Sequence, residues 1–261
     1  MYETIVTEKK GKSGWIILSR EERRNALNPD MLVELDKAFK ELDNDDEVVS
    51  IVLTGSGEKA FCSGMDLGGG AAMQLSYLER YEMQRGFLKL FKTIKDLKKP
   101  LVARVQGIAL GGGFGLMCGC DMAIASDNAK CGTPEINLGL FPYIIMATLI
   151  RVTNNQKALL EMMMTGDKIS AGKAKDLGFI NEVVKPDELD QKVEELTDKL
   201  NSKSPAILRL GRRSFYTIRD MEYEKALDYL SAMLAVNTQA EDMVEGVMAF
   251  MEKRKPEWKG K

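Results

Sequence analysis

Strand-like apolar runs alternate with helical patterns along most of this chain, and only helical patterns follow about residue 187. Runs typical of buried strands cover residues 14–18, 48–55, 101–105 and 122–125. Strands separated by helices favour a mostly parallel β-sheet with helical crossovers. A length of 261 residues suits one large α/β domain, alone or with a small helical appendage.

Local signals place the predicted helices. Asn28 before Pro29 fits an N-cap followed by proline at the first helical position. A long helical pattern covers residues 73–97 and stops before Pro100. Beyond the predicted sheet, apolar spacing predicts three more helices, with the last running from Tyr223 toward Phe250.

Composition excludes several kinds of chemistry. The chain has no histidine, so triads and zinc sites that need this residue are ruled out. Its four cysteines form no C-x-x-C pair, and we expect buried, reduced thiols and no metal site. Proton transfer near neutral pH must then use carboxylates, Lys, Tyr, Cys or water.

Charge and hydropathy indicate where the protein works. The net charge of −2 gives no general attraction to nucleic acid or to an anionic membrane. No apolar run has the length of a membrane span, and the first residues lack the regions of a signal peptide. We therefore expect a cytoplasmic protein without nucleic-acid or membrane partners.

Three segments have residues suited to a ligand site. Residues 107–115 contain a glycine run between a strand and an apolar helix, where free N–H groups favour negative charge. Residues 60–67 form a small-residue loop after a strand, and Glu135 follows Pro134 among apolar neighbours. Taken singly, these segments also fit a tight turn, a surface loop and a helix N-terminal charge.

The order and spacing of these segments resemble the enoyl-CoA hydratase/isomerase (crotonase) family. The matching residues are 58–67, 99–113 and 132–135, with further matches at 24–28, 165–171 and 245–254. The resemblance implies an α/β fold, a ClpP-like spiral of β-β-α units with a C-terminal helical trimerisation region. It places the core and the acyl-CoA site in residues 1–195. Residues 196–261 would form homotrimers or homohexamers and cover the CoA.

The resemblance also implies roles for individual residues. The backbone N–H groups of Met65 and Gly112 would form an oxyanion hole for a thioester enolate, and Glu135 would be the catalytic acid or base. Coenzyme A belongs to the substrate, so no separate cofactor is implied. The residues implied to bind it are Asn25, Ala26, Leu27, Ala60, Gly64, Asp66, Leu67, Phe250 and Lys253. We interpret Asp66 and Asp121 as structural first, since Asp commonly orders turns and caps.

One position departs from the family pattern. Typical hydratases of the family carry a second catalytic glutamate where this chain has Gly115. The hypothesis of an enoyl-CoA hydratase is slightly favoured over a Δ3,Δ2-enoyl-CoA isomerase that uses the same glutamate. A non-catalytic acyl-CoA-binding protein is the third hypothesis. Tyr143, Glu79 and Glu82 are weaker candidates for the missing group.

Overall fold

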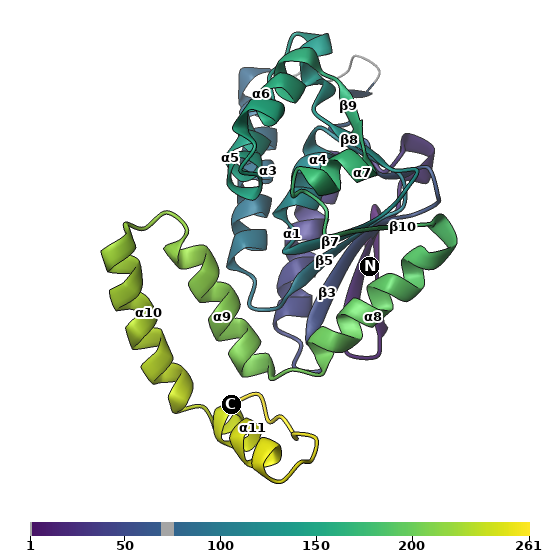
Figure 1. Cartoon of the computed structure of the whole chain (residues 1–261). Coiled ribbons are helices and arrows are strands. Elements are labelled where there is room, and N and C mark those ends of the chain that lie inside the picture. Colours follow the sequence, from purple (N-terminus) through teal and green to yellow (C-terminus); the bar gives the residue numbers. More distant parts are fainter. Residues whose placement is uncertain (1, 69–75) are drawn as a thin grey trace.

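Two β-sheets and the helices that cover them form the body of the protein (Figure 1). The computed structural model describes residues 2–68 and 76–261. The large sheet has the order β1-β2-β3-β5-β7-β10. Its strands are Ile5–Lys10, Ser13–Leu18, Ser50–Gly55, Leu101–Val105, Met122–Ser126 and Glu182–Val184. The small sheet has the order β4-β6-β8-β9 and consists of Ala60–Cys62, Ile108–Leu110, Lys130–Gly132 and Lys168–Ser170.

The chain repeats one unit as it passes between the sheets. β3 pairs in the large sheet, β4 in the small sheet, and helix α3 (Tyr77–Asp96) follows. β5, β6 and α4 (Gly112–Gly119) repeat this order, and β7 and β8 begin it again. The predicted spiral of β-β-α units is therefore confirmed. Only the pairs β1–β2 and β8–β9 are antiparallel among the described strand pairs.

Apolar packing holds both faces of the large sheet. α1 (Pro29–Asp43) begins at Asn28, whose side chain accepts a hydrogen bond from Met31 N–H, as the Asn-Pro pattern predicts. α1 and α3 pack on the main core. α8 (Leu189–Asn201) covers the other face through Leu189 and Val193. The predicted division between residues 195 and 196 falls inside α8.

Two secondary-structure predictions need correction. Residues 60–62, interpreted as part of a loop, form β4, and residues 108–110, interpreted as part of a strand-to-helix turn, form β6, because strands of three residues are too short to show a period of two. The single helix predicted from Tyr223 toward Phe250 is wrong. It is divided into α10 (Tyr223–Thr238) and α11 (Glu241–Met251). The predicted helical residues 73–75 lie outside the described residues.

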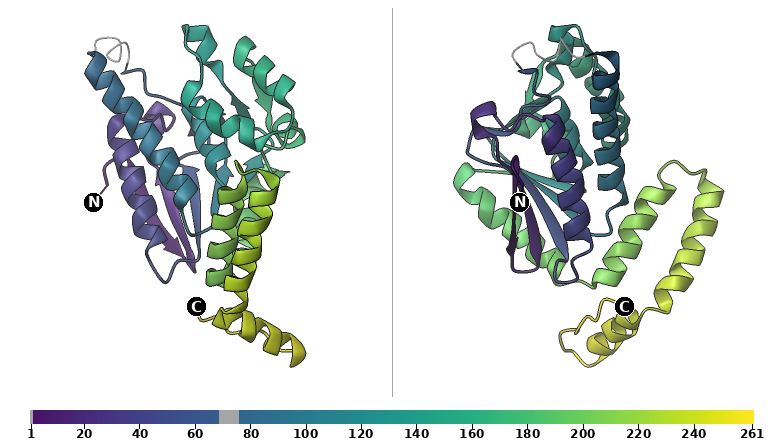
Figure 2. Two further views of the ribbon diagram at one scale, coloured as in Figure 1. Left: turned by 90° about the vertical axis from the view of Figure 1, so that its left-hand side faces the viewer. Right: turned by 180° about the vertical axis from the view of Figure 1, so that it is seen from behind.

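The last helices extend away from the body (Figures 1 and 2). α9 (Pro205–Ile218) leads to α10 and α11, and these two carry exposed apolar side chains such as Leu234, Val244 and Phe250. Three further helices, α5 (Tyr143–Val152), α6 (Gln156–Thr165) and α7 (Ala171–Asp176), complete the α-helical elements of the described chain. None of the described helices has the length and apolar character needed to span a membrane.

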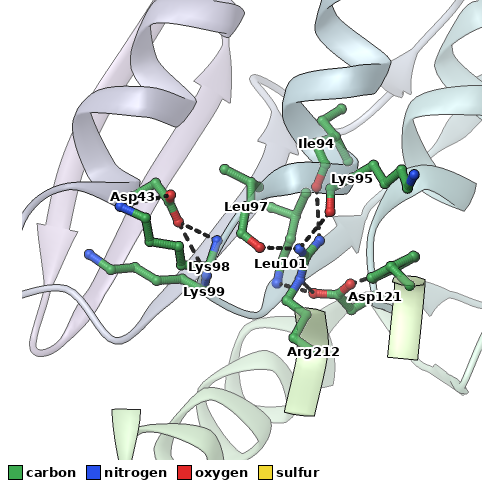
Figure 3. Close-up of polar contacts among 10 residues, drawn as sticks. Asp43, Ile94, Lys95, Leu97, Lys98, Lys99, Leu101, Asp121 and Arg212 are labelled. Carbon is green, nitrogen blue, oxygen red and sulfur yellow. Dashed lines mark hydrogen bonds and ion pairs between the residues drawn. The ribbon is translucent and has the colours of Figure 1, made fainter. Parts of the chain in front are cut away.

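A buried arginine anchors α9 to the body (Figure 3). Arg212 donates to the backbone carbonyls of Ile94, Lys95 and Leu97 at the end of α3. Its Nε lies 2.8 Å from Asp121 Oδ2, which also accepts from Leu101 N–H. Carbonyls at a helix C-terminus need external donors, and this guanidinium supplies them.

Candidate active site

Three parallel strands of the small sheet bring the three candidate segments together. β4 pairs with β6, and β6 pairs with β8, so their carboxyl ends lie at one edge. Met65, Gly112 and Glu135 each follow one of these strands within a few residues. Ligands of α/β folds commonly bind at such an edge. The structure therefore explains why residues far apart in sequence lie at one site.

A cavity of about 400 Å³ lies at this edge. It is lined by residues of all three segments and by side chains of α3 and α5: Ser63, Gly64, Met65, Leu67, Gln84, Phe87, Gly111, Gly112, Pro134, Glu135, Leu138, Leu140, Phe141, Pro142, Tyr143, Ile144 and Ile145. Most of these side chains are apolar. Glu135 is the only carboxyl group among the lining residues that the structure describes.

The Met65 backbone is held by its neighbours. Leu27 N–H donates to Gly64 O, and Asp66 N–H donates to Leu27 O, both at 2.8 Å. This isolated parallel bridge leaves the N–H of Met65 itself out of the pairing. Within the described chain that N–H donates to no other group. It is thus a fixed donor on a residue that lines the cavity.

The Gly112 amide is a second such donor. Gly112 is the first residue of α4, so its N–H has no partner inside the helix. Gly111 before it has φ 53°, which glycine adopts readily, and its own N–H donates to Gly132 O of β8. The loop that carries the Met65 amide lies close to the Gly112 amide. A Cβ built on Gly64, the residue before Met65, would be 3.5 Å from Gly112 N.

Glu135 stands beside these amides without a side-chain partner. It belongs to the 3₁₀ helix η3 (Pro134–Leu138). A Cβ built on Gly111 would lie 3.0 Å from Glu135 Oε1. Glu135 Oε2 is buried and has no hydrogen-bond partner among the described residues. Burial raises the pKa of Glu135, while the hydrogen bond with its own backbone N–H acts in the opposite direction.

The three weaker candidates for a second acid or base lie in different environments. Tyr143 lines the cavity but is largely exposed. Glu79 faces solvent and closes a capping box with Ser76 at the start of α3, which lowers the pKa of its carboxyl. Glu82 pairs with Arg85 on the same helix. Sequence reasoning missed Gln84 and Phe87, whose contribution depends on how α3 packs.

Among the residues predicted to bind CoA, Gly64 and Leu67 line the cavity. Asn25 is fully buried at φ 55°, and its side chain bonds to Ser56 and to the Ala60 carbonyl. Leu27 and Ala60 are also buried, and the Ala26 carbonyl accepts from Arg20. These four residues lie outside the cavity lining and support the loops that reach it.

Asp66 is engaged in structural contacts. Its carboxylate lies 2.7 Å from Arg20 Nη2 and accepts from Gly68 N–H. The hydrogen bond from Arg20 is the main cause of its lowered pKa. The ion pair fastens the loop after β4 to the segment before Asn25.

Phe250 and Lys253 do not join the Glu135 cavity within one chain. Phe250, at the end of α11, is 85% exposed and lines a different cavity of about 930 Å³ between the body and the C-terminal helices. Lys253 follows α11 with φ 54° and is exposed.

The four cysteines are buried and unpaired. Burial raises the pKa of Cys62, next to the site, to about 12.

The fold and the site of this chain agree with one family model. The enoyl-CoA hydratase/isomerase model matches residues 9–261. The chain therefore belongs to the enoyl-CoA hydratase/isomerase family, as its motifs indicate.

Named relatives agree with this assignment. A short-chain-enoyl-CoA hydratase of Clostridium acetobutylicum is 33% identical, with 97% of this chain and 96% of that protein covered. A crotonyl-CoA hydratase of Syntrophomonas wolfei is 34% identical over 97% of each chain. The crystal structure of an enoyl-CoA hydratase of Mycobacterium smegmatis superposes with a TM-score of 0.93 at 34% identity. It covers 98% of this chain and 99% of that one.

Proposed function

We propose that this chain is an enoyl-CoA hydratase-type enzyme that adds water to the double bond of an unsaturated acyl-CoA. The observation that carries the proposal is the unpartnered Glu135 Oε2 in a cavity lined also by Met65 and Gly112. Relatives named as hydratases support the choice of reaction. Buried polar groups usually have partners, so an orphaned carboxyl oxygen in a cavity marks a site for chemistry.

The proposed reaction uses one carboxyl group twice. The thioester oxygen accepts hydrogen bonds from the N–H groups of Met65 and Gly112. Glu135 as carboxylate takes a proton from water while the water oxygen bonds to the β-carbon, and the electrons of the double bond move to form the thioester enolate. Glu135 then returns the proton to the α-carbon. One donor to such a developing charge is typically worth about 3 kcal/mol.

The isomerase remains the second candidate because a specific observation favours it. No carboxyl group other than Glu135 lines the described cavity. A double-bond shift needs a single base, which removes a proton at one carbon and returns it two carbons away. Under this alternative the same two amides stabilise the same kind of enolate.

Product analysis separates the candidates. A hydratase converts a 2-enoyl-CoA to a product heavier by one water. An isomerase converts a 3-enoyl-CoA to the conjugated 2-enoyl-CoA without change of mass. Tight binding of both thioesters with no turnover would leave only an acyl-CoA-binding protein and would overturn the proposed activity.

We further propose that the active form is a homotrimer or homohexamer in the cytoplasm. The exposed apolar side chains of α10 and α11 fit burial against other copies. Gly64, Asp66 and Leu67 would contact the CoA from the same chain, while Asn25, Ala26, Leu27 and Ala60 would hold the loops that carry these contacts. Phe250 and Lys253 would contact it from a neighbouring copy, since within one chain they lie away from the Glu135 cavity. Light scattering on the purified protein measures the oligomeric state.

A further inference from the structure

The position where typical hydratases carry a second glutamate is closed by a neighbouring helix. Gly115 lies in α4 and is buried. A Cβ built on it would overlap Ile145 Cγ2 and would lie 2.8 Å from Ile145 Cβ and 3.2 Å from Phe91 Cζ. Real Cβ atoms essentially never lie within 3.0 Å of another heavy atom, and both Ile145 atoms are inside this limit, so α4 and α5 can approach to this distance only at a glycine.

Ile145, rather than Gly115, forms the cavity wall at this point. Ile145 lines the described cavity and is 4% exposed, whereas Gly115 and Phe91 are absent from the lining. The isoleucine side chain therefore separates the cavity from the glycine behind it. Its neighbours in the wall, Ile144 and Phe87, are also apolar.

The geometry of α4 relates this wall to the acyl chain. Gly112, whose free N–H faces the proposed thioester oxygen, lies three residues before Gly115, about 4.5 Å along the helix axis. Ile145 packs against Gly115 and lines the cavity, so it would stand beside the carbons that follow a thioester carbonyl held at Gly112. A β-branched side chain is stiff and yields little to a substituent there.

We propose that Ile145 determines the acyl specificity of this site by restricting the cavity to acyl groups without a branch at the β-carbon. The proposal rests on the proposed function, because it assumes that an acyl-CoA occupies the cavity. Truncation of Ile145 opens the cavity toward Gly115 and Phe91. The site then accepts bulkier, branched acyl groups at the expense of straight ones.

The test compares Ile145→Ala with the wild type on crotonyl-CoA and on 3-methylcrotonyl-CoA. We expect the ratio of kcat/KM for the branched over the straight thioester to rise about tenfold or more in the variant. Leu149→Ala is the matched control, since Leu149 is buried on the same helix one turn later but does not line the cavity. That variant should leave the ratio unchanged. An unchanged ratio in folded Ile145→Ala would overturn the proposal.

A binding arm keeps this proposal separate from the proposed function. Calorimetry with butyryl-CoA and 3-methylbutyryl-CoA, which lack the reacting double bond, should show the same change in preference. If the wild type turns over no enoyl-CoA, the proposed activity fails and the binding ratio alone decides the role of Ile145. If Ile145→Ala does not fold, Ile145→Val should show a smaller change in the same direction, and no change would contradict the proposal.

Discussion

The carboxyl groups of Glu135 and Asp121 are both partly buried, but their hydrogen-bonding environments are opposite. Asp121 accepts from Arg212, from Leu101 N–H and from Tyr216 Oη at 2.7–2.8 Å. Glu135 Oε2 has no partner among the described residues. The polar groups around Asp121 satisfy one another, whereas the cavity that Glu135 lines with Met65 and Gly112 contains a carboxyl oxygen without a hydrogen-bond partner.

This difference separates stability from chemistry. The Asp121 cluster joins α3, β5 and α9, so its loss should lower the free energy of unfolding (Figure 3). The Glu135 carboxyl joins no other element in the described chain, and its buried Oε2 has no hydrogen-bond partner there, which costs free energy that a bound partner would recover. Loss of this carboxyl group should therefore lower kcat/KM.

The largest expected effect is on catalysis. Glu135→Gln should lower kcat/KM by about 10³-fold, because the amide cannot carry a proton between water and carbon. Steady-state kinetics with an enoyl-CoA measures this change, and binding of a saturated acyl-CoA should be retained. The control is Glu79→Gln, which removes a carboxyl group from the exposed N-terminal capping box of α3 and should keep full turnover. Comparable losses in both variants would remove the distinction between the two carboxyl groups.

The next effect is on stability. Arg212→Met should lower the free energy of unfolding by about 3 kcal/mol, since it removes the donor to three helix carbonyls and the cation paired with Asp121. Denaturant unfolding measures it, and the folded variant should keep its turnover. Arg104→Met removes the pair with the exposed Asp190 carboxylate and should cost far less. Equal costs would show that the Arg212 cluster is no anchor.

A smaller effect concerns packing between α4 and α5. Gly115→Ala should destabilise the protein by about 2 kcal/mol through overpacking against Ile145, despite the better helix propensity of alanine. Gly119→Ala on the same helix meets only ordinary contacts, the nearest at 3.5 Å, and should be neutral or stabilising. Combining Gly115→Ala with Ile145→Ala should cost less than the sum of the single changes. Strict additivity would mean that the two residues do not press on each other.

The smallest effect is on pH dependence. Because burial raises the pKa of Glu135, the acid limb of the kcat/KM profile should lie above the ordinary glutamate pKa, with activity lost as pH falls through it. The stability contribution of Glu135 changes with pH in the opposite direction to the activity. A raised folded-state pKa favours the protonated form, so the contribution of Glu135 to stability is present below its unfolded pKa and is lost as pH rises through the folded value.

The stability part of this prediction is measured by unfolding over a range of pH. Wild type should be less stable relative to Glu135→Gln at neutral pH than at low pH. A difference that does not depend on pH would argue against a raised pKa.

Sequence patterns predicted much of the fold but only part of the site. The start of α1 at Asn28-Pro29 and the buried strand β5 depend on residues next to each other in sequence, so local patterns predicted both. The small sheet could not, because three-residue strands carry too little periodicity. The break between α10 and α11 at Gln239 and Ala240 contains no glycine or proline, so the sequence did not predict it.

The convergence of Met65, Gly112 and Glu135 on one cavity was predictable only through the family resemblance, since each segment alone fits a turn or a loop. The roles of Gln84, Phe87 and Ile145 depend on how α3 and α5 pack against α4, which no local pattern shows. Gly115 was visible as a missing glutamate. That Ile145 fills its place is a property of the packed structure.

If the backbone amides of Met65 and Gly112 polarise a thioester carbonyl, the vibrational spectrum of a bound acyl-CoA with an isotope-labelled carbonyl will show it. We expect the carbonyl stretch to move to lower frequency on binding, and we expect the shift to persist in Glu135→Gln. A bound thioester whose carbonyl frequency equals that of the free molecule would contradict it.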